Sequence, residues 1–292
     1  MTRQIRLAIP LLLALTTTIA FAQKPADTKP EEVDKEYLPL VKQLKERDAK
    51  VRAKAATELG EKGEAAASTA TALCDAIMDT SPRVTQAALV ALEKVRPDLY
   101  KYLSVIVLDK SRTRRFEAIA ELGGIAEKAT PTKKILLAQL RAESVTLKPI
   151  WDLYSSDTPR VGQISGINIQ RSDSAILVLL SVVEQIDADN ADAHKVRKTL
   201  AGVGNKLPES RLEAIDALMR WAGEDEMRRK EVLPIIGSTL NDNSLLLAGI
   251  PRLASYGKLS KGYLPTLKKL KLAAAEVVRE AATRAVDAIE EK

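Results

Sequence analysis

The sequence is short of the side chains that most catalytic and metal-binding sites need. It has one histidine, His194, and one cysteine, Cys74, in 292 residues. A disulfide framework, a zinc site of several Cys and His ligands, and a triad that needs several histidines are therefore excluded. Only 3% of the residues are aromatic, whereas alanine occurs 41 times. This composition favours closely packed helices over a β-sandwich.

The common catalytic motifs are missing as well. The sequence has no glycine-rich phosphate loop, no G-x-S-x-G nucleophile turn and no H-E-x-x-H metal motif. Carboxylates are numerous, but no two of them stand out as a general acid and its base. We therefore expect a protein that is not an enzyme and that has no cofactor and no metal site.

Residues 1–22 have the three parts of a secretory signal peptide. Arg3 and Arg6 give a positive start, residues 7–15 form an apolar run, and residues 20–22 read Ala-Phe-Ala. A small-residue motif of this kind predicts cleavage after its last residue, Ala22. The apolar run is too short for a transmembrane anchor. We expect a secreted or periplasmic protein.

Residues 23–36 combine prolines with charges of both signs and contain a single branched apolar side chain. A segment of this composition cannot bury enough apolar surface to fold, and it predicts a flexible spacer. The formal net charge of the whole sequence is +6. That excess is modest, and in an exported protein it does not predict nucleic-acid binding.

From Tyr37 onward the apolar residues recur at i, i+3, i+4 and i+7, which is the helical period. They also recur on a longer period of roughly 30–34 residues, which is typical of stacked repeats. Polar residues that can cap a second helix recur in the same way at Asp48, Ser81 and Ser111. The apolar set Leu40, Leu44, Val51, Ala55 and Leu59 returns 33 residues later as Leu73, Ile77, Val84, Ala88 and Leu92.

The first two units, LPLVKQLKERDAKVRAKAATELGEKG and ATALCDAIMDTSPRVTQAALVALEKV, resemble the HEAT repeat. They share leucine-rich first helices, an Asp or Ser turn, and second helices that open with Val-Arg or a similar pair. The closing segment AAAEVVREAATRAVDAIEEK resembles it again through Val278, Arg279, Ala282 and Val286. The resemblance covers most of residues 37–291 and is weakest in the middle.

The resemblance implies an all-α fold, a right-handed α-solenoid of about seven helical pairs. The fourth pair is too long, and we expect an insertion at about residues 143–173, followed by a helix at Ser174–Ile186. The predicted units are 37–66, 67–99, 100–129, 130–187, 191–223, 226–257 and 262–291.

HEAT arrays generally hold proteins on a concave surface lined by their second helices. The resemblance therefore implies a non-catalytic scaffold or adaptor with a protein partner, and it does not suggest a small-molecule ligand. The candidate exposed residues on these helices are Lys50, Lys54, Arg83, Gln86, Glu117, Glu213, Arg220 and Arg284.

The insertion is a second candidate for partner binding. Long loops inside compact arrays are uncommon and are often functional. Trp151 and Tyr154 could anchor a partner, because aromatic side chains dominate binding energies at interfaces. They could equally cover the exposed edge of neighbouring helices. The sequence favours neither interpretation.

Arg52, Arg115, Arg211 and Arg279 occupy equivalent positions in their units. They could form a basic ladder for an anionic partner. The preferred interpretation is structural: each guanidinium, with its five donors, ties the preceding turn to a nearby carbonyl or acid.

Other polar residues receive structural interpretations. The run of residues 187–192 offers oxygen atoms at alternate positions, but it lacks the glycine and the final glutamate of a calcium loop. Turn and helix-cap roles explain these residues as well. We expect His194 to be a solvated helix residue and Cys74 to be a buried small apolar residue.

Two further functional classes remain open. Some HEAT-like arrays resemble lyases that attach chromophores, and others stand beside catalytic domains. A function of either kind would require a small-molecule cleft near the insertion. Basic clusters at residues 111–115, 228–230 and 268–271 could bind a polyanion or an envelope surface. Neighbouring acidic residues make solvated faces the simpler explanation of these clusters.

Overall fold

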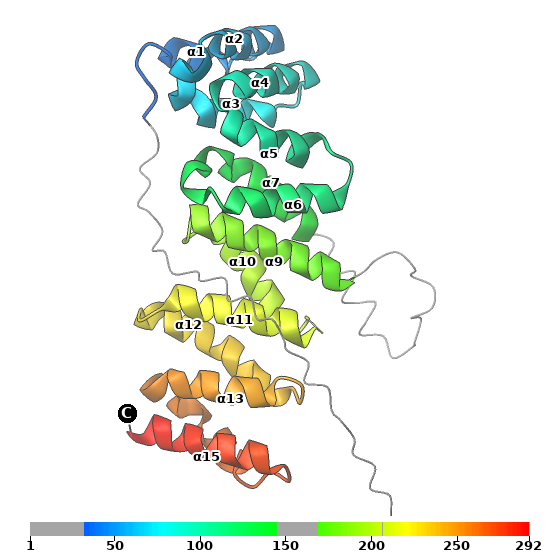
Figure 1. Ribbon diagram of the computed structural model, residues 1–292. Coiled ribbons are helices and arrows are strands. Elements are labelled where there is room, and N and C mark those ends of the chain that lie inside the picture. Colours follow the sequence, from blue (N-terminus) through cyan, green and yellow to red (C-terminus); the bar gives the residue numbers. More distant parts are fainter. Residues whose placement is uncertain (1–31, 145–168, 206, 292) are drawn as a thin grey trace, which may run out of the picture.

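The computed structural model describes residues 32–144, 169–205 and 207–291. All regular secondary structure within these ranges is helical, and none of it is strand. The helices stack along one long axis, from α1 (Leu38–Gln43) at one end to α15 (Glu276–Glu291) at the other (Figure 1). The predicted all-α class is confirmed for the described part of the chain.

The bounds of the helices are as follows. The first half contains α1 Leu38–Gln43, α2 Ala49–Glu61, η1 Gly63–Thr69, α3 Ala70–Ile77, α4 Pro82–Val95, α5 Pro97–Leu108, α6 Arg112–Gly123, η2 Ala126–Lys128, η3 Thr130–Thr132 and α7 Lys133–Ser144. The second half contains α9 Ile169–Ile186, α10 Ala191–Ala201, α11 Pro208–Ala222, α12 Glu226–Gly237, η4 Ser238–Asn241, α13 Leu246–Ser255, η5 Gly257–Tyr263, α14 Leu264–Leu270 and α15 Glu276–Glu291.

Consecutive helices contact each other in pairs, as an array of helical pairs requires. The pairs are α1 with α2, α3 with α4, α5 with α6, α7 with α9, α10 with α11, α12 with α13, and α14 with α15. Neighbouring pairs also touch through their second helices, which include α2 with α4, α6 with α9, and α13 with α15. We call the second member of each pair a second helix.

The third pair interrupts the stacking of the first helices. The helix α5 contacts α4 and α6, and it lies between them in Figure 1. The helix α3 contacts α7 and η3, although they belong to the second and fourth predicted units. An ion pair between Asp75 of α3 and Lys134 of α7 joins the same two helices. The 30-residue repeat did not reveal this contact.

The second helices begin with the expected residues, and two of the three predicted caps are present. Asp48 accepts a hydrogen bond from the backbone N–H of Lys50, and Ser111 accepts one from that of Arg114. Ser81 makes no such bond, contrary to the prediction. Its own N–H donates instead to the Asp79 carboxylate, at 2.8 Å. Pro82 follows as the first residue of α4, where an N–H would have no helical partner.

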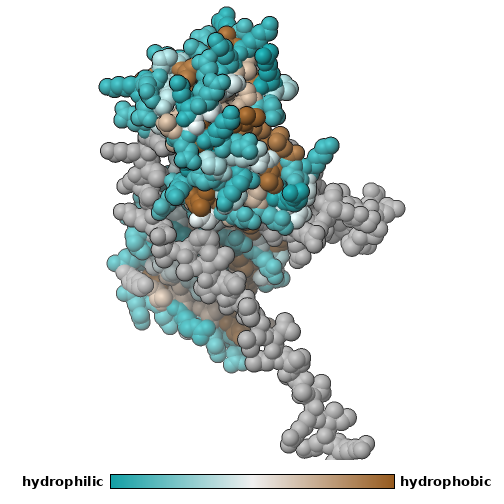
Figure 2. Space-filling view, turned by 45° about the horizontal axis from the view of Figure 1, so that its top comes forward, coloured by the Kyte–Doolittle hydropathy of each residue, from teal (hydrophilic) through white to brown (hydrophobic). Residues whose placement is uncertain are grey.

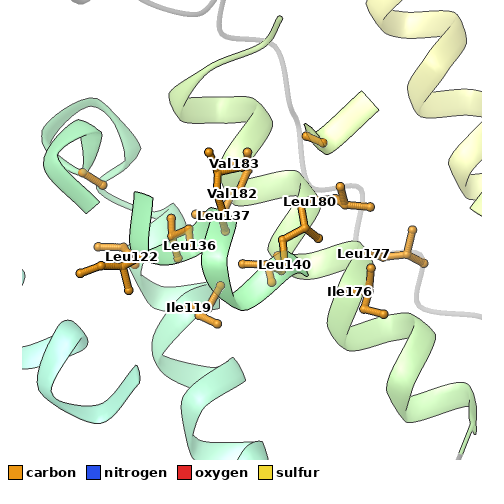
Figure 3. Packing of buried hydrophobic residues seen from close by; sticks show 14 of the residues in the cluster. Ile119, Leu122, Leu136, Leu137, Leu140, Ile176, Leu177, Leu180, Val182 and Val183 are labelled. Carbon is orange, nitrogen blue, oxygen red and sulfur yellow. The ribbon is translucent and has the colours of Figure 1, made fainter. Parts of the chain in front are cut away.

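The core is a continuous apolar layer between the helices. Figure 3 shows side chains of α6, α7 and α9 meeting in its middle part, among them Leu122, Leu136 and Val182. Leu122 and Leu136 are fully buried, and Val182 is 3% exposed. Burying one such side chain contributes about 1.5–3 kcal/mol. Cys74 belongs to the same layer and has no exposed surface, as predicted.

Two glycines allow second helices to approach closely. A Cβ on Gly60 of α2 would lie 2.8 Å from the Ala91 Cα of α4, and a Cβ on Gly123 would lie 2.9 Å from Val182 Cγ2. Neither glycine has a positive φ, whereas Gly63 does, with φ +59°. Gly60 and Gly123 therefore serve packing between helices, rather than the left-handed turn for which glycine at a helix end is usually needed.

Several expected boundaries lie at the edges of the described residues. The predicted signal peptide 1–22 and most of the predicted spacer lie outside them. Val33 packs against the core, and Asp34 bonds with Ser68 of η1, so the last residues of the predicted spacer contact the helices. The helix α9 begins at Ile169, earlier than the predicted Ser174. Within the described residues no helix is both long and apolar enough to cross a membrane.

Candidate functional site

The candidate residues on the second helices are all exposed in the structure. They lie on α2, α4, α6, α11 and α15, which the repeat positions as separate second helices. The exposed set is Lys50, Lys54, Arg83, Gln86, Glu117, Glu213, Arg220 and Arg284. Their exposure makes them accessible to a partner, while their role in binding stays a prediction.

A shallow pocket of about 360 Å³ lies between α2 and α4 and includes two of these candidates. Residues of α4 form one side, from Arg83 at its first turn to Lys94 at its last. Residues of α2 form the other side. The described residues that line it are Thr57, Gly60, Arg83, Gln86, Ala87, Val90, Ala91 and Lys94. We call this pocket the α2–α4 groove.

Helical spacing explains why these side chains share one face. On α4, Arg83, Gln86, Val90 and Lys94 follow one another at intervals of three or four residues, so they form a single stripe along the helix. The repeat pattern predicted Arg83 and Gln86 as partner contacts, but it did not predict Lys94. Extending the same stripe by two further turns would have found it.

The floor of the groove is made of small apolar groups. Gly60 and Ala91 are buried where α2 and α4 touch, and Ala87 lies half-buried beside them. Val90 at the rim is 43% exposed. Figure 2 shows a surface that is largely hydrophilic, with apolar residues exposed in limited patches. An exposed valine among small apolar groups offers a place for an apolar side chain of a partner.

The charges in the groove are all positive. Of the described residues that line it, only Arg83 and Lys94 are ionisable. Within the described part of the chain, no carboxylate lies in salt-bridge range of either one. Lys54 on α2 differs, since its ammonium lies 3.5 Å from Glu58.

Most cations of the basic clusters named from the sequence form ion pairs with acidic residues. Arg112 pairs with Glu143 at 2.8 Å, and Arg114 pairs with Asp109 at 2.9 Å. The other clusters behave alike, through Arg228 with Asp189, Arg229 with Glu224, Lys230 with Glu226, and Lys268 with Glu290. These contacts agree with the simpler interpretation, in which the clusters lie on solvated surfaces and nearby acidic residues neutralise their positive charges.

Three of the equivalent arginines hold their turns through backbone carbonyls. The Arg52 guanidinium donates to Glu46 and Arg47, Arg115 to Asp109 and Lys110, and Arg279 to Ala273 and Ala274. Each arginine thus reaches the carbonyls six and five residues before it. Arg52 also makes a two-pronged contact with Asp79, which lowers the pKa of that carboxyl. The structural interpretation is supported at these positions.

Arg211 is more deeply buried than its counterparts and has different hydrogen-bond partners. Its side chain is only 2% exposed, and it donates to the Ala201 carbonyl at 3.0 Å. It also reaches Asp242 at 2.9 Å and Ser238 at 2.7 Å, which lie beyond the next helix. Burial lowers its pKa, while Asp242 opposes that shift. Arg211 therefore ties two successive helical pairs together.

The expectation for His194 is wrong. Its imidazole is 7% exposed and lies against the Trp221 ring, with the ring centres 4.3 Å apart. Neither ring nitrogen has a hydrogen-bond partner among the described residues. Burial lowers its pKa. The cause is packing: α10 turns this residue toward α11, where Trp221 covers it.

The polar side chains of residues 187–192 pair with basic residues, accept a hydrogen bond from a tryptophan, or cap a helix. Asp187 pairs with Lys133 at 2.6 Å, and Asp192 pairs with Arg141 at 2.6 Å. Asp189 accepts a hydrogen bond from Trp221 Nε1, and Asn190 caps α10. Among the described residues no three His, Cys, Asp or Glu side chains are placed to hold a metal ion. Trp151 and Tyr154 lie outside the described residues.

Comparisons with known proteins agree with the repeat pattern. Residues 37–123 match a family model described as HEAT repeats, which confirms the resemblance over that stretch. None of the curated proteins that were compared matches the chain significantly. An engineered protein from the Northeast Structural Genomics Consortium is 16% identical, covering 88% of this chain and 98% of its own, with a TM-score of 0.31.

A designed armadillo repeat protein is 18% identical, and the match covers 86% of this chain and 98% of the designed one. Its TM-score is 0.21. TM-scores this low carry no weight for either fold or function. The family match and the contacts between the helices are the grounds on which the repeat fold rests.

Proposed function

We propose that this protein is an exported, non-catalytic scaffold that binds a protein partner through the exposed face of its second helices. HEAT repeats occur in the chain, and a repeat fold of this kind is typically an interaction scaffold. The observation that carries the proposal is the α2–α4 groove. It brings Arg83 and Gln86, both chosen from the sequence as partner contacts, into one accessible pocket.

The proposed array has seven helical pairs in a right-handed solenoid, with the second helices on its concave side. Seven successive contacts between paired helices support this count in the described residues. The insertion of the fourth pair, with Trp151 and Tyr154, is proposed as a second contact surface. Replacing both aromatics by alanine should weaken partner capture and leave the melting temperature nearly unchanged.

Export is proposed from the sequence of residues 1–22 alone. Expression of the full chain in a bacterium should release a mature protein that begins at Gln23, which N-terminal sequencing of the periplasmic fraction would show. A chain that keeps residues 1–22 and stays in the cytosol would contradict this part of the proposal.

Site-specific photo-cross-linking tests the binding face. A benzoylphenylalanine at Gln86 should capture a defined partner in the native compartment, because Gln86 lines the groove. The matched control is the same probe at Lys258, an exposed residue of η5. Equal capture at both positions, or no adduct at Gln86, Glu117, Glu213 and Arg284, would overturn the proposed function.

A further inference from the structure

We propose that the α2–α4 groove recognises an acidic segment of the partner, an extended stretch with two carboxylates on either side of a small apolar residue. This inference rests on the proposed function and specifies the chemistry of the partner at the same face. It follows from the charges, the floor and the length of the groove.

Charge complementarity selects an acidic occupant. Arg83 and Lys94 stand at the two ends of the groove, and no carboxylate of the described residues is in salt-bridge range of them. Gln86 and Thr57, the other polar residues among the described lining, carry no charge. In the basic cluster at residues 111–115, by contrast, the exposed Arg114 is already paired with Asp109. Arg83 and Lys94 therefore differ from Arg114, because their charges remain available to a carboxylate of a partner.

The floor selects a small apolar residue between the two carboxylates. Gly60, Ala87 and Ala91 present little more than backbone and methyl groups, and Val90 leaves 43% of its surface exposed. The groove is open and shallow, with a volume of about 360 Å³. It would leave much of a free small molecule in water, whereas small-molecule sites usually enclose most of their ligand. One side chain of a larger partner fits it better.

The length of the groove sets the spacing of the carboxylates. Arg83 and Lys94 are eleven positions apart on α4, and at 1.5 Å per residue they are separated by about 16 Å along the helix axis. An extended peptide advances about 3.3 Å per residue, so about five residues span the same distance. The Gln86 amide lies between the two cations and can bond to the peptide backbone.

A peptide selection tests this chemistry with the full chain. A phage library of random twelve-residue peptides is panned on the wild-type protein, with counter-selection on Arg83→Glu/Lys94→Glu. The recovered peptides should be richer in Asp and Glu than the starting library, with acidic residues about five positions apart. Synthetic copies carrying fluorescein then give dissociation constants by anisotropy.

Each named variant gives a defined outcome. Arg83→Glu/Lys94→Glu should weaken the selected peptides at least about tenfold, because two exposed ion pairs become repulsive contacts. Arg83→Gln/Lys94→Gln should weaken them less. Lys258→Glu/Lys261→Glu changes the net charge equally, on exposed residues of η5, and should have no effect. Circular dichroism checks that all three variants remain folded.

Three results would overturn the inference. The selected peptides could lack acidic residues, the selection could yield none that depend on Arg83 and Lys94, or heparin could bind with the same dependence on these two residues. The last result would make the groove a polyanion site. If cross-linking at Gln86 still captures a protein in any of these cases, the proposed function stands and only the acidic chemistry fails.

Discussion

At the scale of the residue, one arginine position recurs along the chain, and three of its four arginines make the same contacts. Arg52, Arg115 and Arg279 donate to the carbonyls six and five residues earlier. These carbonyls belong to the turn before a second helix, where the regular helical pattern leaves them without a partner. At the equivalent position of the second pair, the Thr85 hydroxyl donates to the Asp79 carbonyl. The turn, rather than a ligand, explains why donors recur at this position of the repeat.

Replacing Arg52 by alanine should therefore destabilise the protein. The variant removes the donors to two carbonyls and leaves the half-buried Asp79 without its guanidinium. The free energy of unfolding should fall by about 1–3 kcal/mol. The control is Arg83→Ala, an exposed arginine one repeat further along, which should change stability by less than about 0.5 kcal/mol. Urea denaturation measures both, and equal effects would contradict the structural role of Arg52.

The buried imidazole of His194 predicts a pH dependence near neutrality. Burial lowers its pKa, so below about pH 6.5 the unfolded chain binds a proton that the folded chain resists. The free energy of unfolding should be highest above that pH. It should fall as the pH drops through that value, by at most about 1.4 kcal/mol per pH unit. Glu184 and Asp189 oppose the shift, and Lys198 reinforces it.

Urea denaturation at pH 7.5, 6.5 and 5.5 measures this effect. The comparison is His194→Leu, which keeps an apolar group against Trp221 and removes the proton site. The variant should lose most of the dependence over this range. Carboxylates respond mainly at lower pH, so they should not obscure the result. Parallel curves for the wild type and the variant would show that His194 does not govern stability in this range.

At the scale of the element, glycines decide how closely the helices approach. A Cβ on Gly249 of α13 would lie 1.7 Å from the Thr239 hydroxyl oxygen, and Thr239 is fully buried. Gly249→Ala should therefore force α13 and η4 apart and cost about 1–3 kcal/mol. Gly262→Ala is the control, because a Cβ added there would meet no atom within 4 Å. Calorimetric melts should separate the two variants clearly, and similar melting temperatures would count against this packing.

The sequence predicts elements better than it predicts their contacts. The helical and 33-residue periods located α2 and α4, because burial repeats with the pattern of leucine and alanine along each helix. The contact between α3 and α7 could not be predicted, since it depends on where α5 lies in space rather than on a local pattern. The close approach at Gly60 was likewise hidden, because glycine near a helix end usually indicates a turn.

Part of the α2–α4 groove could be predicted from the sequence, and part of it could not. Arg83 and Gln86 were found because exposed positions follow directly from the helical period. Thr57 and Gly60 were missed because they come from α2, and only the packing of α2 on α4 shows that the two helices share a pocket. The burial of His194 was missed for the same reason, since Trp221 comes from the next helix.

At the scale of the whole molecule, stability should be local, because each helix packs mainly on its neighbours. The helix α13 contacts α12, α15, η4 and η5, whereas α2 and α4 lie toward the other end of the stack (Figure 1). In an array of this kind, stability is approximately a sum over units and the interfaces between them. Damage at one end should therefore not reach the other, apart from direct contacts such as that between α3 and α7.

Hydrogen exchange of the Gly249→Ala variant tests this local behaviour. Amide exchange should become faster in α12, α13 and α15, since these helices share the packing that the added methyl group disturbs. Exchange in α2 and α4 should match the wild type. Peptide-level mass spectrometry resolves the two regions in one experiment. A uniform increase across all helices would mean that the chain unfolds as one cooperative unit, and the additive description of the array would then be wrong.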